Sequence, residues 1–287
     1  MQFKVNSSIG KRSEMTKPIL KQMIVFLFVV CGLNAKAGNF VRYGGASAAG
    51  LGQSVVAYSK AGYFQNQALI TRFDSIYIEL YSAIPFAITE FGTHSVFVAA
   101  PLLGGVTSFQ YQYFGYQSYN ENKTGVAYAR KLGKGLSIGV QLSWLRVYIP
   151  DPYTTSNNLL AEVGLSYELN KFLNFGAHVF NPTLSKPVQD DSETPETAMR
   201  VGVSYRPIEA VVCNVELVQW LNHKTSFRVG VDLQLTSNLS VQTGYNHDNQ
   251  TVGVGLGLDH KSFVFVFAGS YHNILGYSPH LSIGKHF

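Results

Sequence analysis

The stretch Phe227-Arg-Val-Gly-Val-Asp-Leu-Gln-Leu235 separates its side chains into two classes. Every second position is apolar, whereas arginine, glycine, aspartate and glutamine fill the positions between them. Because successive side chains of a strand point to opposite sides, this period of two predicts a β-strand with an apolar and a polar face. Val231 is expected on the apolar face. Gly230 is expected on the polar face, where Gly230→Ser would reach water and leave stability nearly unchanged.

The same division recurs along the chain, at residues 159–167, 199–205 and 252–258, and no segment after residue 70 keeps apolar residues at helical spacing. Longer connections are expected at 83–93, 115–122, 149–157, 181–196, 220–225 and 272–278, with tight turns between them. Fourteen strands are expected, near residues 75–82, 94–100, 104–114, 123–132, 135–148, 158–169, 172–180, 197–205, 209–219, 226–235, 239–246, 251–258, 262–271 and 279–287.

Three features favour a membrane barrel over a soluble β-sandwich, whose strands also alternate. Short turns alternate with longer connections, as between the periplasmic and external ends of outer-membrane barrels. Aromatic residues recur at strand ends, as in interfacial girdles: Tyr113, Trp144, Tyr148, Tyr167, Tyr205, Trp220, Tyr245 and Tyr271. The chain ends in an alternating strand with the aromatic Phe287, which resembles a barrel-assembly signal. The sequence therefore predicts an all-β, transmembrane, antiparallel up-and-down barrel of about fourteen strands over residues 75–287.

The first 37 residues have the three parts of a secretory signal peptide. Lys17 and Lys21 precede an apolar run at 23–33, and Ala35-Lys-Ala37 ends the segment as a small-x-small cleavage site, whether the start is Met1 or Met15. This segment holds six of the 22 basic and one of the 17 acidic residues, so residues 38–287 are neutral. The formal charge of +5 therefore gives no reason to expect a nucleic acid partner.

Ionisable residues occupy polar-face positions in several predicted strands. These residues can line a passage and select ions, or they can form ion pairs across neighbouring strands and fill the interior. We favour the ion pairs, because charges in such interiors are normally paired with one another. These lumen charges are Glu79, Glu162, Arg200, Glu216, Arg228 and Asp232.

The sequence offers no convincing catalytic or metal site, so we expect neither an enzyme nor a cofactor. Gly135-Leu-Ser137-Ile-Gly139 matches the pattern of a hydrolase nucleophile elbow, but Ser137 lies inside a predicted strand instead of a strand-to-helix turn. The eight histidines show no recognised metal-ligand spacing. Removal of the signal peptide leaves Cys213 without a second cysteine.

Residues 42–70 differ from everything that follows. Glycine and alanine dominate the stretch 42–57, and Asn66-Gln-Ala68 follows shortly after. The segment is too glycine-rich and irregular for a spanning strand, so we expect residues 38–74 to enter the barrel or close its periplasmic mouth. It resembles the N-terminal segment of FadL-like barrels and of their Bacteroidota relatives, the PorV/PorQ family, in which a small-residue stretch ends near an Asn-Pro-Ala motif.

That resemblance implies that the segment is a hatch in the lumen, with Gly50, Gly52, Asn66, Gln67 and Ala68 as its characteristic residues and Gln67 in the place of proline. It also implies a non-enzymatic accessory barrel for type IX secretion or surface anchoring. The alternative is a FadL-like channel for hydrophobic small molecules, although the lumen residues assigned from the sequence are mostly polar. Expected partners are outer-membrane lipid and the barrel-assembly machinery. Secretion-system components are a further expected partner of an accessory barrel, and a hydrophobic small molecule is one of a channel.

We predict that the protein fractionates with the outer membrane and that its mature form begins at Gly38. The signal peptide, the terminal Phe287 and the two-faced strands all point to this outcome. N-terminal sequencing of the detergent-extracted protein checks the cleavage site, and a heat-dependent gel shift checks barrel folding. Recovery from the soluble periplasm without detergent would contradict the prediction.

Overall fold

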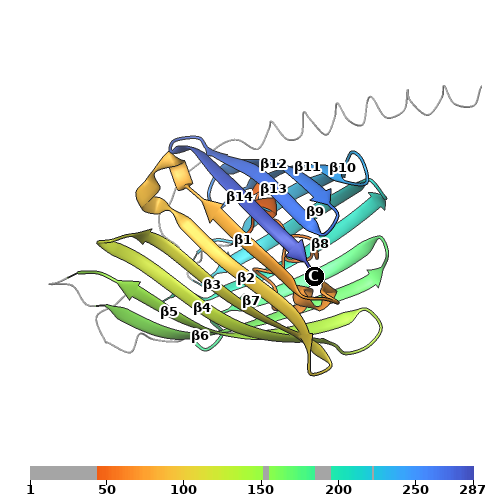
Figure 1. The fold of residues 1–287 in the computed structure, drawn as a ribbon, viewed down its shortest axis with the longest axis horizontal. Helices are drawn as coiled ribbons and strands as arrows, with labels where there is room; N and C mark the ends of the chain where they lie inside the picture. The colour runs from red at the N-terminus through yellow and green to blue at the C-terminus, as the bar shows by residue number, and fades with distance from the viewer. Residues whose placement is uncertain (1–43, 151–154, 185–194, 222) are drawn as a thin grey trace, which may run out of the picture. The chain divides into compact units, whose positions relative to one another are not determined.

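A computed structural model describes residues 44–150, 155–184, 195–221 and 223–287. The predicted signal peptide lies outside these residues. Within them the chain forms one closed, antiparallel barrel in which each strand pairs with its neighbours in sequence and β1 closes the ring by pairing with β14 (Figure 1). The predicted all-β barrel of fourteen strands is therefore confirmed.

The strands are joined by connections of two to four residues at one end and of up to 17 residues at the other. We call the first end, where Tyr77 pairs with His286, the terminal rim, and the second the loop rim. The strands are β1 (Tyr77–Ala83), β2 (Thr93–Leu102), β3 (Gly105–Tyr116), β4 (Tyr119–Lys131), β5 (Leu136–Tyr148), β6 (Ser156–Asn170), β7 (Leu173–Phe180), β8 (Ala198–Ile208), β9 (Val211–Trp220), β10 (Ser226–Gln234), β11 (Leu239–Asn246), β12 (Thr251–His260), β13 (Phe263–His272) and β14 (Gly276–His286).

The long connection predicted at 115–122 is wrong. β3 and β4 continue their ladder to the pair Tyr116 and Tyr119, so that two residues make the turn. The polar Asn120 and Asn122 belong to β4 and not to a loop. They lie where long strands end near the loop rim, and Asn122 accepts a 2.6 Å hydrogen bond from the Tyr111 hydroxyl.

The outward face of the barrel is apolar along its middle. Leu142, Val215 and Val254 are each more than half exposed, as lipid-facing residues are before a bilayer covers them. Trp144 and Tyr205 also face outward, as predicted for an aromatic girdle. Trp220 does not: it faces the interior and is 4% exposed, because the strand β9 presents Val218 and Trp220 inward near the loop rim.

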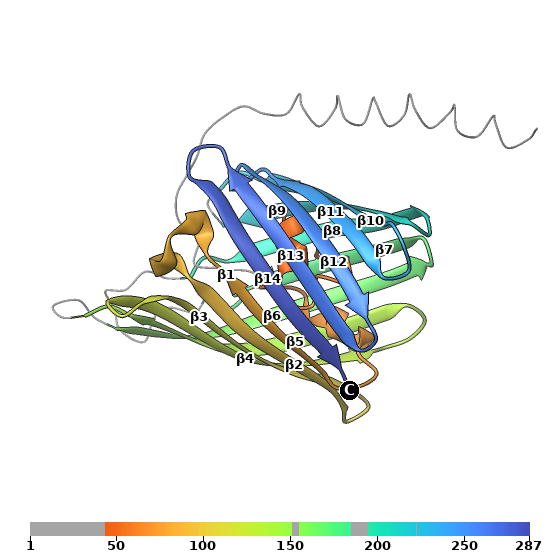
Figure 2. The same cartoon turned by 45° about the horizontal axis from the view of Figure 1, so that its top comes forward.

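The N-terminal segment, residues 44–76, lies inside the ring of strands (Figure 2). It contains the single helical turn α2 (Ala46–Gly50), which contacts β11 to β14 and β1, and the 3-10 helix η1 (Gln67–Arg72), which contacts β3 to β6. Two further 3-10 turns, η2 (Pro85–Ala87) and η3 (Thr89–Phe91), lie between β1 and β2. Among the described residues, no helix is both long and apolar enough to cross a membrane.

Val231 offers a test of which face meets lipid. It lies outward on β10 between Cys213 of β9 and Thr243 of β11, and Val231→Arg should cost about 2–4 kcal/mol of barrel stability if this face lies at mid-depth in a bilayer. The control Leu235→Arg, in the terminal-rim turn, should cost about 0–1 kcal/mol because the penalty falls near the interface. Urea unfolding from liposomes measures both. Equal losses of stability in the two variants would show that Val231 does not face lipid.

Candidate functional site

Inward-facing glycines form a track around the barrel wall, and the backbone of the N-terminal segment lies on it. Cross-strand neighbours include Gly139 with Gly164, and Gly230 with Gly244. The order of contacts follows the order of the strands: residues 49–51 meet β12, β11 and β10, Val56 meets β8 and β7, and residues 66–68 meet β6 and β5. The track comprises Gly139, Gly164, Gly176, Gly202, Gly230, Gly244 and Gly253.

A side chain at any of these glycines would collide with the segment. A Cβ on Gly139 would lie 2.5 Å from the carbonyl carbon of Gln67, and a Cβ on Gly164 would overlap the Asn66 side chain. A Cβ on Gly230 would lie 2.5 Å from Ser54 Oγ and 2.6 Å from Leu51 O. The expectation that Gly230→Ser is silent is therefore wrong. The residue faces the interior as predicted, but protein covers it instead of water.

The residues at the Asn-Gln-Ala motif make a dense set of hydrogen bonds at the start of η1. Asn66 caps the helix by accepting from the Ala68 N–H at 3.1 Å, and its Nδ2 donates to Val56 O at 2.7 Å. Gln67 Nε2 donates to Glu162 Oε2 at 3.0 Å. All three residues are at most 1% exposed. Because proline has no side-chain amide, Gln67 gives this motif an additional bond to the wall.

Gly50 and Gly52 both lie where the segment passes close to β11 and β12. A Cβ on Gly50 would lie 3.1 Å from the Cα of Gly255. Gly52 has a φ of +60°, a backbone conformation that favours glycine. A Cβ on Gly52 would also lie only 2.5 Å from Tyr245 N, so the available space requires glycine as well. The sequence indicated that these glycines matter, but their contacts were not predictable from it.

Glu216 on β9 holds the middle of the segment. One oxygen, Oε2, accepts the backbone N–H groups of Val55 and Val56 at 3.0 and 2.9 Å. The other, Oε1, lies 3.3 Å from Arg228 Nη1, and Arg228 Nη2 lies 2.9 Å from Asp248 Oδ2. Glu216 and Arg228 are directly paired residues on adjacent strands and are at most 2% exposed. This carboxylate thus satisfies two buried backbone donors and one buried cation together.

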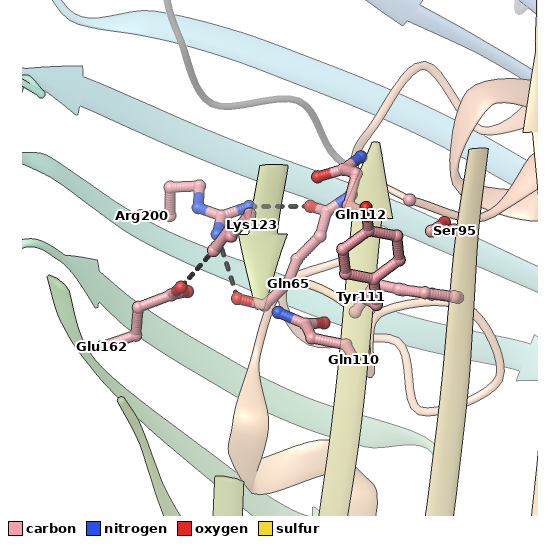
Figure 3. Close-up of a pocket in the computed structure, with 10 residues that line it drawn as sticks. Gln65, Ser95, Gln110, Tyr111, Gln112, Lys123, Glu162 and Arg200 are labelled. Atoms are coloured by element: carbon pink, nitrogen blue, oxygen red, sulfur yellow. Dashed lines mark hydrogen bonds and ion pairs between the residues drawn. The ribbon is translucent and has the colours of Figure 1, made fainter. Parts of the chain in front are cut away.

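Glu162 and Arg200 form a second anchor (Figure 3). Lys123 Nζ and His178 Nε2 lie 2.5 and 3.2 Å from the two Glu162 oxygens. Arg200 donates to the side chain of Gln65 at 2.7 Å and to its carbonyl at 3.0 Å. Arg200 and His178 Nδ1 are 2.8 Å apart, so the two groups belong to one network. The network connects strands β4, β6, β7 and β8 to the segment.

Tyrosines of the segment donate to two further carboxylates of the wall. Tyr58 donates to Asp232 Oδ2 at 2.8 Å, and burial together with the negative charge of Asp232 raises the pKa of the Tyr58 hydroxyl well above its usual value. Tyr58 therefore remains a donor. Tyr63 donates to Glu79, which also accepts from Tyr77 at 2.8 Å. Glu79 and Asp232 are at most 4% exposed.

The six predicted lumen charges all lie in the interior, but cross-strand pairing does not describe most of them. Arg228 pairs with Glu216 on the neighbouring strand, as expected. Lys123 reaches Glu162 from β4, two strands away. Five of the six charges, namely Glu79, Glu162, Arg200, Glu216 and Asp232, bond the N-terminal segment. The expectation treated the wall as complete by itself and did not include the segment as a partner.

The interior also contains apolar clusters that the sequence reasoning missed. One joins Tyr63, Phe64 and Phe73 of the segment to Tyr77 and Phe97 of the wall. Another lies near the loop rim and contains wall residues alone: Leu145, Val147, Leu160, Phe180, Ala198, Val218 and Trp220. Large inward residues in every second position of adjacent strands were the available signal, and it was obscured because their outward neighbours are apolar as well.

Several cavities adjoin the described residues of the segment. The one in Figure 3, toward the loop rim, is lined by Phe64, Gln65, Gln112 and Lys123 among others and has a volume of about 20 Å³. Two larger cavities of about 270 and 250 Å³ adjoin Arg72, near the terminal rim. The cavity in Figure 3 admits roughly one water molecule, for which about 10–15 Å³ suffices. Each of the two cavities near the terminal rim is large enough for several water molecules.

The remaining sequence-based candidates occupy ordinary structural positions. Ser137 lies within β5 and accepts a 3.1 Å hydrogen bond from Thr71 Oγ1. Phe287 is exposed at the terminal rim, with its N–H bonded to Ile76 O at 2.9 Å and its ring under Lys285 Nζ at 4.3 Å. Its role as an assembly signal stays a prediction.

No known protein-family model matches the chain, and no curated protein sequence is significantly similar to it. Among solved structures, the CymD monoaromatic hydrocarbon channel has a TM-score of 0.62 at 11% identity, covering 88% of this chain and 99% of that one. A Pseudomonas aeruginosa FadL homologue has a TM-score of 0.62 at 9% identity, covering 88% and 100%. The Pseudomonas putida toluene transporter TodX has a TM-score of 0.63 at 11% identity, covering 87% and 98%. The chain thus shares the fold of FadL-like outer-membrane β-barrel channels, and this coarser part of the predicted resemblance is confirmed.

We predict that Glu216→Gln loosens the middle of the segment. The neutral amide weakens two hydrogen bonds to backbone N–H groups and leaves Arg228 with less compensation, a loss of about 1.5–3 kcal/mol for charge-assisted bonds. Hydrogen exchange at Val55 and Val56 should accelerate accordingly. The control Glu209→Gln, in an exposed turn, should leave their exchange unchanged. Unchanged exchange in Glu216→Gln would contradict the anchoring role.

Proposed function

We propose that the protein is a plugged outer-membrane channel of FadL-like type for hydrophobic small molecules. The observation that carries this proposal is the N-terminal segment seated on the glycine track inside a closed barrel. In this proposal residues 38–74 form the hatch, residues 75–287 form the pore, and residues 1–37 are removed during export. The relatives in fold support the cargo class, since they include a monoaromatic hydrocarbon channel and a toluene transporter.

The interior chemistry also supports an apolar cargo. The cluster around Leu160, Phe180 and Trp220 gives the loop-rim end of the lumen an apolar inner wall. A purely polar interior would solvate a hydrophobic molecule poorly. The cargo would enter past this wall, and the segment would have to shift before it could pass further, because the segment lies in the lumen in close contact with the wall.

A second candidate is an accessory barrel of PorV/PorQ type in protein secretion or anchoring. The small-residue N-terminal segment suggested it, and the position of that segment in the lumen supports it, because an accessory barrel needs no open pore. The relatives in fold favour the channel. The two proposals differ in what loss of the protein does: a channel mutant takes up an aromatic hydrocarbon more slowly, whereas an accessory mutant retains exported proteins or fails to anchor them.

Gly164→Val tests the channel proposal. The added side chain collides with Asn66 and Gln67, so the segment should leave its seat. We expect a several-fold higher conductance in planar bilayers and faster uptake of toluene into cells. The matched control is Gly133→Val, at an exposed turn where a Cβ meets nothing within 4 Å.

Heat-dependent gel mobility verifies that both variants remain folded barrels. A folded Gly164→Val with the conductance of the parent protein would show that the segment does not close the pore. Raised ion conductance without faster toluene uptake would retain the plug but reject the cargo class.

A further inference from the structure

The larger of the two cavities near the terminal rim opens between the N-terminal segment and the wall. Its volume is about 270 Å³, several times the roughly 30 Å³ that one water molecule occupies in the liquid. Tyr58, Ser59 and Arg72 line it from the segment. The wall contributes residues from the connections between β4 and β5 and between β6 and β7, and from the adjoining end of β8. The cavity is therefore bounded by both parts that would separate when the segment moves.

The charges around this cavity are unbalanced. Four basic side chains, Arg72, Lys131, Lys171 and Arg206, line it together with one acidic side chain, Glu168. The neighbouring cavity of about 250 Å³ is balanced, with Lys60, Arg72 and Lys261 against Glu79, Asp232 and Asp259. Since residues 38–287 are neutral as a whole, the excess of positive charge is a local property of the larger cavity.

Hydrogen bonds hold two of these basic residues at the cavity. Arg72 Nη1 donates to Ser59 O at 3.1 Å and to Lys60 O at 3.2 Å, two carbonyl acceptors that leave the positive charge in place. The Arg206 N–H donates to Phe172 O at 2.7 Å, which holds Arg206 beside the turn that carries Lys171. These bonds fix the Arg72 guanidinium and the Arg206 backbone at the cavity, while the exposed side chains of Lys131, Lys171 and Arg206 can turn toward a bound anion.

We propose that this cavity binds a phosphate group, which bridges Arg72 of the segment to Lys131, Lys171 and Arg206 of the wall. Like charges on the two parts repel each other while the segment is seated, and a bound oxyanion reverses the sign of that interaction. Arginine and lysine are the usual partners of phosphate oxygens. The site lies at the terminal rim, away from the apolar loop-rim wall, and the proposal holds whether or not the hydrophobic cargo is correctly identified.

Titration of the mature protein in neutral detergent with inorganic pyrophosphate tests the site. We expect one pyrophosphate per chain. The double variant Lys171→Gln/Arg206→Gln should weaken binding about tenfold or more, because it removes two of the four charges. The control Lys134→Gln/Lys261→Gln removes two charges from the same rim but none from this cavity, and should change affinity less than about twofold. Heat-dependent gel mobility confirms folding of each variant.

Hydrogen exchange of residues 57–72 supplies the second readout, since a bridging anion should slow exchange there in the parent protein and not in Lys171→Gln/Arg206→Gln. Nanodiscs of phosphatidylcholine with and without phosphatidylglycerol separate the two sources of phosphate. Protection by phosphatidylglycerol without pyrophosphate binding assigns the site to a lipid headgroup, and binding in detergent assigns it to a soluble phosphate. No binding and no protection in either setting, or equal weakening in both double variants, overturns the proposal.

Discussion

The backbone of residues 49–68 lies against the Cα atoms of the wall glycines, and this close approach governs how the interior is built. A fourteen-stranded barrel encloses more space than its own small inward side chains fill. An irregular chain can occupy that space if its N–H and C=O groups find partners, since buried backbone groups without them are costly. Glycine brings the segment within reach of those partners. Glu216, Asn174 and Ser282 then bond its backbone at 2.5–3.0 Å.

The buried charges of the wall follow from the same constraint. A carboxylate buried in a barrel normally has a cation on a neighbouring strand, and Glu216 has one in Arg228. Glu79 and Asp232 instead accept hydroxyl groups of the segment, and Arg200 donates to the Gln65 backbone. Removal of the segment would leave these groups in need of water or new partners. Their placement thus makes the seated segment part of the folded interior instead of a loosely held tail.

The strand pattern was predictable from the sequence because lipid and lumen impose opposite chemistry on alternate residues, as in Phe227–Leu235. All fourteen strands were found this way, with bounds shifted by a few residues. The alternation of apolar and polar residues does not indicate whether water or another part of the chain covers the inward face of a strand. Gly230 was read as facing water, and Trp220 as part of the girdle, because a lumen filled by a distant segment leaves no local signal at either position. The polar Asn120 and Asn122 misled in the other direction, since a strand that continues toward the loop rim resembles a loop in composition.

The two halves of the segment are held by different forces, and this difference decides which half is cheaper to displace. Residues 63–73 bury Tyr63, Phe64 and Phe73 against wall aromatics, and each such side chain contributes about 1.5–3 kcal/mol by leaving water. Residues 46–54, which precede the Glu216 contact, meet the wall through two small alanines, Ala46 and Ala49, and through hydrogen bonds between neutral groups, each with a net contribution of about 0.5–1.5 kcal/mol because water can replace it. Leu51 and Val55 pack largely against Tyr58 and other residues of the segment itself. These side chains therefore stay partly buried when the segment leaves the wall. An opening that begins at the glycine track on β10 to β12 and leaves the aromatic cluster intact is therefore less costly than one that begins at η1.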